Sequence, residues 1–382
     1  MDSPAGYRIH DNIPLPGNLD QVDVHVTRDD DYRIHVLPDV DRAVDALLTE
    51  LDGRRAVVIT DDVVADLHEG RISAELAARG QLIGRTAIRA GEKSKSLTTA
   101  FELIDWLAEV DLARRDVVIA LGGGVVVDTV GFVASAYMRG VPYLNMPTTL
   151  LAQVDAGIGG KVAVDHSEAK NLVGAFYQPK AVISCLEHLR TLDTRQIRSG
   201  LAEVVKKAVI ASPELFDYIE ANADDLLACA SPAIDVLVHA AGAIKTKLVG
   251  RDPYEIDLRR PLNFGHTTGH AVETVTNYGP VLHGEAVAFG MVVAVDVARA
   301  RGLVVPEVAD RITALIRRLG LPVALEELGA VPRVDDVVAA LLKIRQIRDG
   351  SLRFVLPVEL GATVIAEDVT EDEVRAALVR LR

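Results

Sequence analysis

Apolar runs and amphipathic segments alternate regularly along the first part of the chain. Loose alternation of apolar and polar residues predicts strands at residues 22–27 and 32–37. Short apolar runs predict strands at residues 56–60 and 117–121, and one just before residue 89. Helical spacing of apolar residues predicts helices at residues 39–51, 97–110 and 125–136. Alternating strands and helices are typical of a parallel sheet, so this part is predicted to be an α/β domain.

The pattern changes after about residue 178, where predicted helices follow one another with little strand signal. They lie at residues 201–211, 214–228, 233–247, 266–276 and 285–301, and a strand is expected at 352–356. A chain of 382 residues exceeds the roughly 250–300 residues that one core usually reaches. We therefore predict an α/β domain at residues 1–180 and a mainly helical domain at residues 181–382.

Composition narrows the classes of function. The chain has 41 Lys and Arg against 55 Asp and Glu, and its net charge of −14 argues against nucleic acid as a partner. An anionic small substrate requires cations gathered in one cleft. No run approaches the roughly 18 apolar residues of a membrane span, and no signal peptide is expected. Two cysteines, Cys185 and Cys229, suit a reducing cytoplasm.

Polar residues concentrate in residues 146–177, MPTTLLAQVDAGIGGKVAVDHSEAKNLVGAFY. Around a glycine run stand two hydroxyls, a carboxylate, two ammonium groups and an amide: Thr148, Thr149, Asp155, Lys161, Lys170 and Asn171. Cations and amide donors beside glycines suit a phosphate or another anion. The alternative is a polar surface loop with helix caps.

A second glycine-rich segment, Gly122, Gly123 and Gly124, follows the predicted strand at 117–121 directly and leads into a helix. Such a turn places backbone N–H groups and a helix dipole against a pyrophosphate. It departs from the G-x-G-x-x-G pattern, so a tight turn without a ligand is the alternative. Asp128 follows within the first turns of the helix, where the helix dipole also favours an acid.

Histidines and an acid give a candidate metal site. His266 and His270 are four residues apart on one predicted helical face, His283 follows, and Glu203 lies in an otherwise apolar helix. Zinc takes imidazole and carboxylate ligands. Spacing alone favours His266 and His270 as the ligand pair; capping or core histidines are the alternative.

These strings together resemble the sugar phosphate cyclases, and within them 3-dehydroquinate synthase. The resemblance rests on PTTLLAQVDAGIGGK, KNLVGAFYQP, GLAEVVK, GHTTGH and HGE, and extends from Ala90 to about Gly302. It implies an NAD-binding first domain, a second domain that binds metal and substrate, and a homodimer. It also implies zinc, with Co²⁺ as an alternative, held by Glu203, His266 and His283.

The resemblance implies further roles residue by residue. NAD contacts fall to Asp61, Glu92, Lys95, Gly122, Gly123, Gly124, Asp128, Thr148, Thr149, Asp155, Lys170 and Thr191. Substrate and phosphate contacts fall to Arg139 (reaching a neighbouring subunit), Lys161, Asn171, Lys245, Arg259, Asn263, His270 and Arg345. Catalytic roles fall to Asp155, Lys161, Lys206, Lys245, Arg259, Asn263 and His270.

The implied activity is that of a phosphate-eliminating lyase, which turns a 7-phosphorylated heptulosonate into a carbocycle. Its steps are transient oxidation by NAD, elimination of phosphate, re-reduction and intramolecular aldol closure. The retained Lys245, Arg259, Asn263 and His270 favour a carboxylated substrate, such as 3-deoxy-D-arabino-heptulosonate 7-phosphate or an amino analogue.

Several positions depart from that pattern and keep alternatives open. Val126 replaces a glycine, and KVAVDH likewise leans toward cyclases of sedoheptulose 7-phosphate, the valiolone synthase type. Arg345, in Ile344–Gln346, replaces a lysine pair, and Val63 replaces an asparagine. More distant alternatives are an NAD- and metal-dependent alcohol dehydrogenase related to glycerol dehydrogenase and a non-catalytic sensor.

Overall fold

The computed structural model describes residues 31–166, 169–252, 254, 260–347 and 353–382, of which residues 169, 260 and 343–347 are described by their backbone alone. From Tyr32 onward the chain forms one compact unit. The strand predicted at 22–27 lies outside the described residues. The other predicted strands of the first part are confirmed.

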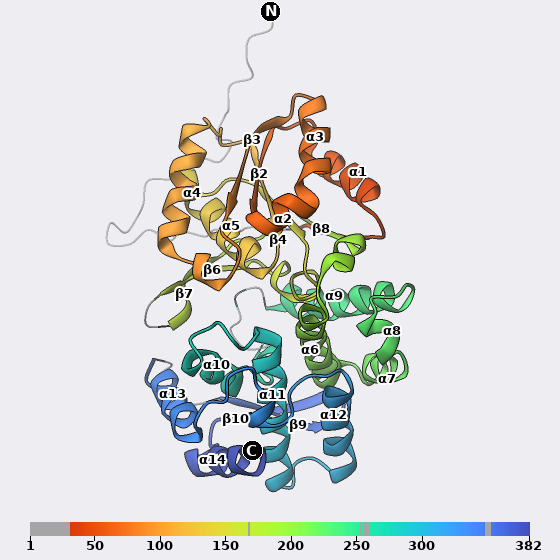
Figure 1. The fold of residues 1–382 in the computed structure, drawn as a ribbon, viewed down its shortest axis with the longest axis vertical. Helices are drawn as coiled ribbons and strands as arrows, with labels where there is room; N and C mark the ends of the chain where they lie inside the picture. The colour runs from red at the N-terminus through yellow and green to blue at the C-terminus, as the bar shows by residue number, and fades with distance from the viewer. Residues whose placement is uncertain (1–30, 167–168, 253, 255–259, 348–352) are drawn as a thin grey trace, which may run out of the picture. The chain divides into compact units, whose positions relative to one another are not determined.

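A parallel sheet of six strands organises the first part of this unit (Figure 1). Its order is β1-β8-β5-β4-β2-β3. The strands are β1 (Arg33–Leu37), β2 (Ala56–Asp61), β3 (Leu82–Ile88), β4 (Val117–Gly122), β5 (Tyr143–Pro147) and β8 (Ala181–Cys185). β8 was not predicted, and it lies beyond the predicted domain boundary at residue 180 while pairing with β1 and β5. The division into two domains stays a prediction.

Helices cover both faces of this sheet, so its inner strands are nearly continuous apolar runs. Val57 and Ile59 of β2 pack against α4 (Leu97–Glu109) and α5 (Gly124–Ala136). Ala56 and Val58 of the same strand pack on the other face against α1 (Val40–Leu51) and α3 (Gly70–Ala78). Successive side chains of a strand point to opposite faces, which explains why near-continuous apolar runs predicted these strands correctly.

The stretch considered as a polar loop is regular structure for much of its length. After β5 comes a π-helical turn, η4 (Ala152–Ala156), followed by the antiparallel pair β6 (Lys161–His166) and β7 (Ala169–Phe176). Val162 and Val164 of β6 are buried in the same core as α5. The loop alternative is therefore wrong over these strands.

The second part of the unit is mainly helical, as predicted. Its helices are α6 (Thr194–Ala211), α7 (Pro213–Ala221), α8 (Ala223–Leu227), α9 (Ala233–Arg251), α10 (His266–Val275), α11 (His283–Ala300), α12 (Pro306–Arg318), α13 (Val334–Ile347) and α14 (Glu371–Arg380). The helix predicted at 214–228 is two helices, because the chain leaves the helical conformation at Asn222. A two-stranded antiparallel sheet joins β9 (Phe354–Glu359) and β10 (Ala362–Ala366).

Glycines allow α6, α10 and α11 to pack at very short range. A Cβ on Gly284 would lie 2.1 Å from the carbonyl oxygen of Ser199, and one on Gly290 would lie 1.9 Å from that of Gly265. No side chain fits at these distances, so both glycines are required by the helix contacts. The three helices meet in the lower half of Figure 1.

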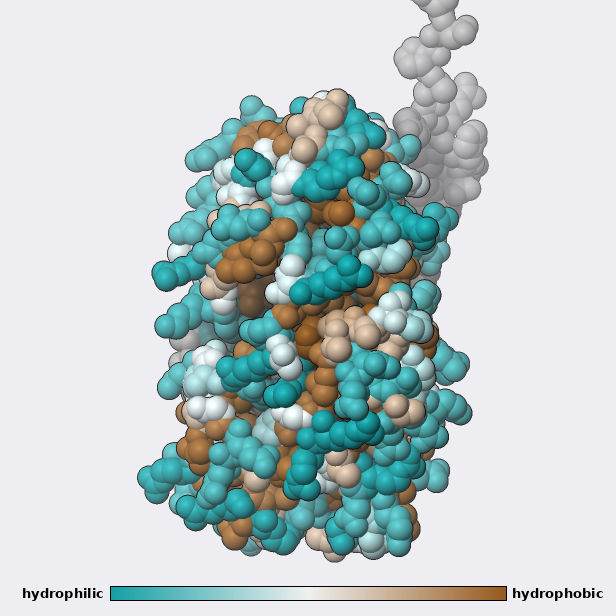
Figure 2. Space-filling view, turned by 45° about the vertical axis from the view of Figure 1, so that its right-hand side comes forward, coloured by the Kyte–Doolittle hydropathy of each residue, from teal (hydrophilic) through white to brown (hydrophobic). Residues whose placement is uncertain are grey.

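Most apolar residues are buried in these cores. On the face shown in Figure 2, hydrophilic residues predominate and hydrophobic residues lie between them, mainly toward the middle. In the described part of the chain, no helix combines the length and apolar character needed to cross a membrane.

Candidate functional site

A large cleft is lined by the carboxyl ends of β2, β4 and β5 and by α6, α10 and α11. Its volume is about 1640 Å³. Ligands of open parallel sheets commonly bind at the carboxyl ends of the strands. Most of the residues predicted from the sequence line this cleft: Asp61, Glu92, Lys95, Gly123, Gly124, Asp128, Thr148, Thr149, Asp155, Lys161, Lys170, Asn171, Thr191, Lys206, Lys245, Asn263, His266, His270 and His283.

The glycine turn between β4 and α5 brings backbone to the surface of the cleft. A Cβ on Gly123 would lie 3.0 Å from Cγ2 of Thr149. A Cβ on Gly122 would lie 2.6 Å from the side chain of Val126, so this valine can be accommodated only against a glycine. The first amide groups of α5 and its dipole suit an anion such as a pyrophosphate.

Lys95 is a buried cation beside this turn. It is 4% exposed, and its Nζ donates to Oδ2 of Asp128 at 2.6 Å and to Oδ1 of Asn171 at 2.5 Å. Burial raises the pKa of Asp128, although the charge of Lys95 opposes this effect. Three predicted contact residues for cofactor and phosphate thus form one hydrogen-bonded group.

Three buried lysines surround Asp155. Nζ of Lys207 donates to its Oδ1 at 2.8 Å, Nζ of Lys245 lies 3.1 Å from its Oδ2, and Nζ of Lys206 lies 4.0 Å from its Oδ1. Burial raises the pKa of Asp155, but the charges of the lysines outweigh it and hold the pKa well below its ordinary value. These cations outnumber Asp155 and nearby Glu203, so this end of the cleft suits a phosphate.

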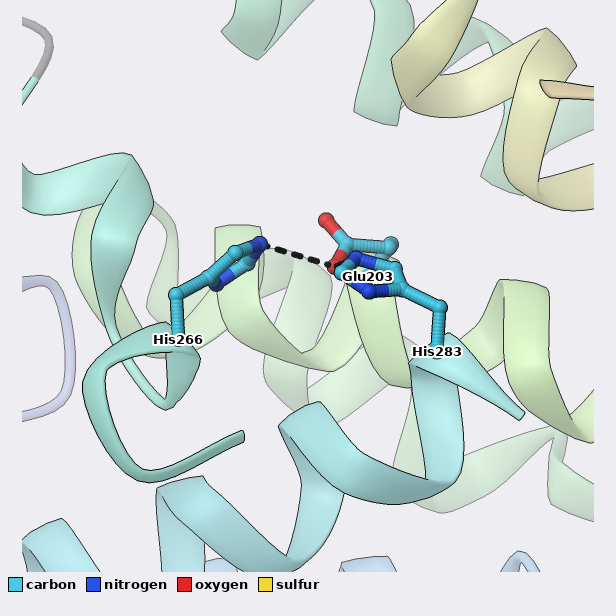
Figure 3. A group of neighbouring side chains, drawn as sticks. All are labelled: Glu203, His266 and His283. Carbon is cyan, nitrogen blue, oxygen red and sulfur yellow. Dashed lines mark ion pairs between the residues drawn. The ribbon is translucent and has the colours of Figure 1, made fainter. Parts of the chain in front are cut away.

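Glu203, His266 and His283 come together from α6, α10 and α11 (Figure 3). Nε2 of each histidine lies 3.6 Å from Oε1 of Glu203, and the ligand atoms of all three residues lie within 4.8 Å of one another. The structure therefore assembles the trio that the resemblance implies.

The chemistry of this trio fits a divalent metal. Glu203 is fully buried, and Lys206 forms an ion pair with its Oε2. Its Oε1, which faces both histidines, accepts no hydrogen bond from any residue that the structure describes. Two imidazoles and one carboxylate are ligand types that zinc takes, and three protein ligands leave a position for substrate.

The surroundings of the two histidines shift their pKa values in opposite directions. Burial and the charge of Lys206 hold the pKa of His266 well below its ordinary value, so its imidazole is neutral. Burial also lowers the pKa of His283, but Glu273 and Glu203 outweigh this effect and raise it to about 9. A metal ion at Nε2 of His283 would compete with a proton for that nitrogen, so metal affinity should depend on pH.

The pair that spacing alone favours, His266 and His270, does not share a candidate metal group. Their rings lie 5.3 Å apart at 89°. His270 instead belongs to a second group with Glu273 and His283. Helical spacing places two histidines on one face, but the third ligand decides which of them points to the metal.

Some predicted residues lie elsewhere. Arg139 is exposed and does not line the cleft. Gly122 is buried and does not line the cleft either. Arg259 lies outside the described residues, as does the side chain of Arg345 on α13. The roles predicted for these residues stay predictions.

Two residues of the site were missed in the sequence. Lys207 is fully buried and also donates to the carbonyl oxygen of Val154 at 2.8 Å. Glu273 is 2% exposed and contacts both Lys170 and His283. Charged residues inside the apolar strings EVVKKAVI and AVETV were the available signal, because charges are rarely buried without partners.

Comparison with known proteins agrees with this geometry. Residues 85–199 match the family model of the N-terminal part of 3-dehydroquinate synthase, and residues 200–343 match that of its C-terminal part. The chain is 99% identical over 382 residues to a 2-epi-valiolone synthase of Actinosynnema mirum, covering 100% of both. It is 42% identical over 326 residues to a 3-dehydroquinate synthase of Desulforamulus reducens, covering 85% of this chain and 90% of that relative.

A solved structure is also similar. It is 2-epi-5-epi-valiolone synthase of Streptomyces hygroscopicus subsp. jinggangensis with bound NAD⁺ and Zn²⁺, with a TM-score of 0.86 at 34% identity. The match covers 94% of this chain and 99% of that one. The predicted resemblance and fold class are thus confirmed, and the predicted NAD and zinc agree with the contents of that structure.

Proposed function

This chain belongs to the sugar phosphate cyclase family of 3-dehydroquinate synthase, and we propose that it cyclises a heptulose 7-phosphate with loss of phosphate, using NAD and zinc. The observation that carries this proposal is the position of Glu203, His266 and His283 in one cleft with the glycine turn at Gly123. A cofactor and a metal held there would act on the same substrate.

Different residues of the cleft would bind the metal, the nucleotide and the phosphate. When bound, NAD supplies a reversible hydride acceptor and zinc supplies a Lewis acid that polarises a substrate oxygen. Glu203, His266 and His283 hold the metal, and the turn at Gly123 receives the nucleotide. The lysines around Asp155 attract the phosphate of the substrate and stabilise the negative charge that the leaving phosphate carries.

We favour sedoheptulose 7-phosphate as the substrate. The near-identical relative is a 2-epi-valiolone synthase, and Val126 and the KVAVDH string lean the same way. Lys245, assigned to the substrate by resemblance, pairs with Asp155 and also donates to its carbonyl oxygen at 2.7 Å.

A carboxylated heptulosonate 7-phosphate is the second candidate. His270 and Asn263 are retained and line the cleft, and the chain is 42% identical to a 3-dehydroquinate synthase. An amino analogue of this substrate would engage the same residues.

The proposal extends to reaction class and assembly. The enzyme is a phosphate-eliminating lyase, and it acts as a homodimer in which Arg139 reaches the phosphate site of the neighbouring subunit. Exposure of Arg139 away from the cleft of its own chain supports this assembly. The cytoplasmic location inferred from composition stays a prediction.

Release of inorganic phosphate tests the function. Purified protein with NAD and Zn²⁺ is given the two candidate substrates in parallel, while phosphate and NADH are measured. We expect phosphate from sedoheptulose 7-phosphate without net NADH. Phosphate from the carboxylated sugar alone would establish the second candidate, whereas net NADH without phosphate would indicate an alcohol dehydrogenase.

Two histidine variants control this assay. His283→Ala removes a metal ligand, so we expect it to lose turnover and most bound zinc. His239→Ala makes the same change at an exposed position on α9, so we expect it to keep turnover and bound zinc. Full turnover in His283→Ala would contradict the proposed metal site.

A further inference from the structure

Glu273 is a buried carboxylate that the proposed reaction does not use. It lies on α10 and is 2% exposed. Its Oε1 lies 3.2 Å from Nδ1 of His283 and 3.0 Å from Nζ of Lys170. Lys170 in turn contacts Oε1 of Glu92 at 2.8 Å. A buried charge with two such contacts fixes its neighbours in place.

The two ring nitrogens of His283 face opposite partners. Nδ1 points to Glu273, while Nε2 points to Oε1 of Glu203. A carboxylate that accepts from Nδ1 keeps the hydrogen on that nitrogen and leaves the lone pair on Nε2. In that tautomer the lone pair faces the proposed metal position. A hydrogen bond of this kind also prevents rotation of the ring.

Glu273 also belongs to a second candidate metal group, with His270 and His283. The contacts of its Oε1 argue against a ligand role for that atom, while its Oε2 accepts no hydrogen bond from a described residue. Lys170 and His283 approach the same atom, Oε1. In Glu203, by contrast, Lys206 pairs with Oε2 while both histidines face Oε1. A metal ion at Oε1 of Glu273 would lie beside an ammonium group, so the first trio is the better cation site.

We propose that Glu273 is a positioning residue for the metal site: it fixes the tautomer and orientation of His283, and Lys170 holds it in place. This inference rests on the metal site of the proposed function. It assigns Lys170 a structural task besides its predicted contact with NAD. The ion pair with Glu92 further anchors this arrangement to the cofactor side of the cleft.

The affinity for Zn²⁺ and the absorption spectrum of the Co²⁺-substituted protein test this proposal without turnover. We expect Glu273→Ala to weaken Zn²⁺ binding by about 10–100-fold, measured by competition with a chelator, as for other residues that hold metal ligands. The Co²⁺ bands should shift, because the ring of His283 is no longer held. Glu273→Gln should recover much of both, since its amide oxygen still accepts from Nδ1.

Two further variants separate the alternatives. Thr274→Ala changes the next residue of α10, which is exposed, and should leave Zn²⁺ affinity unchanged. His270→Ala should also retain Zn²⁺, whereas a metal held by His270, Glu273 and His283 would be lost from it.

The outcomes distinguish this inference from the proposed function. Unchanged Zn²⁺ affinity in both Glu273 variants, with normal binding in the unaltered protein, overturns the positioning role alone. Loss of Zn²⁺ from His270→Ala as well overturns it in favour of a ligand role. Absence of Zn²⁺ binding by the unaltered protein overturns both. If Glu273→Ala does not fold, Glu273→Asp provides the readout: its shorter carboxylate withdraws from Nδ1 of His283, so Zn²⁺ should bind more weakly than to the unaltered protein, and unchanged affinity would overturn the positioning role.

Discussion

His188 carries an imidazole that the fold isolates from water. It is 2% exposed, and neither ring nitrogen has a hydrogen-bond partner among the described residues. Its ring centroid lies 4.3 Å from that of His68. Burial, with a smaller effect from His68, lowers the pKa of His188 to about 3. The residue is therefore neutral at neutral pH and resists protonation in the folded state.

This burial predicts a pH dependence of stability. The unfolded chain binds a proton at His188 below its ordinary pKa of about 6.5, whereas the folded chain does so only near 3. His188 therefore does not reduce the free energy of unfolding above pH 6.5. Between pH 6.5 and pH 3 it lowers this free energy as the pH falls, by up to about 1.4 kcal/mol per pH unit. We expect His188→Leu to lose this component of the slope.

Urea unfolding at a series of pH values measures it. The exposed His239→Leu serves as control and should keep the slope of the unaltered protein. An identical slope in His188→Leu would show that His188 is solvated or protonated in the folded state.

At the residue scale, motifs predicted more than spacing could. Local spacing favoured His266 and His270, yet the structure brings Glu203, 63 positions before His266, into the group. The residues alone offered Glu203 as a candidate, and only the resemblance to a family selected it together with His266 and His283. Lys207 and Glu273 were missed because their partners, Asp155 and His283, are supplied by tertiary packing.

At the scale of elements, buried strands and long helices were predictable, and the β6–β7 pair was not. Glycines and charges around β6 indicated a loop, since these residues disfavour strands. The pair is nevertheless covered, because Val162 and Val164 pack into the core beside α5. Short strands of this kind depend on tertiary contacts, which a local pattern does not contain.

Because α6 and α11 are in close contact, adding one methyl group at Gly284 should destabilise the protein. Gly284→Ala would place Cβ 2.1 Å from the carbonyl oxygen of Ser199, where backbone atoms leave no room. We expect a loss of about 1–3 kcal/mol in the free energy of unfolding, as for other overpacked sites. Zinc affinity should fall as well, because the two helices carry Glu203 and His283.

Gly250→Ala is the matched control, since it lies in α9 with no atom within 4 Å of the added Cβ. Replacing a helical glycine of this kind by alanine should raise the free energy of unfolding by up to about 1 kcal/mol. Equal stability of the two variants, measured by denaturant unfolding, would show that α6 and α11 can separate without cost.

At the scale of the whole molecule, the ligands of one metal join three helices. An ion that binds only the folded state adds to its stability, by about 2.7 kcal/mol at a concentration 100 times its Kd. We therefore expect the midpoint of thermal unfolding to rise with Zn²⁺ and to fall when a chelator removes it.

Calorimetry with and without chelator measures this shift. His283→Ala should unfold at one temperature in both conditions. A shift of equal size in that variant would place the stabilising ion elsewhere in the molecule.

The acidic composition describes the chain as a whole and not its cleft. Despite a net charge of −14, the structure gathers Lys206, Lys207 and Lys245 within 4.0 Å of one carboxylate. Composition argued against a nucleic-acid partner but could not place these cations, since their positions on α6 and α9 meet only through packing.

The glycine contact between α6 and α11 has a practical consequence for engineering this enzyme. Because helix spacing and ligand spacing are set by the same backbone contact, metal retention reports on the packing of the helical core. In a library of variants aimed at new substrates, a colorimetric assay for retained zinc would discard misfolded members before any substrate is synthesised. The residues that line the cleft from the sheet could then be varied separately, while zinc retention reports whether the helices are still packed correctly.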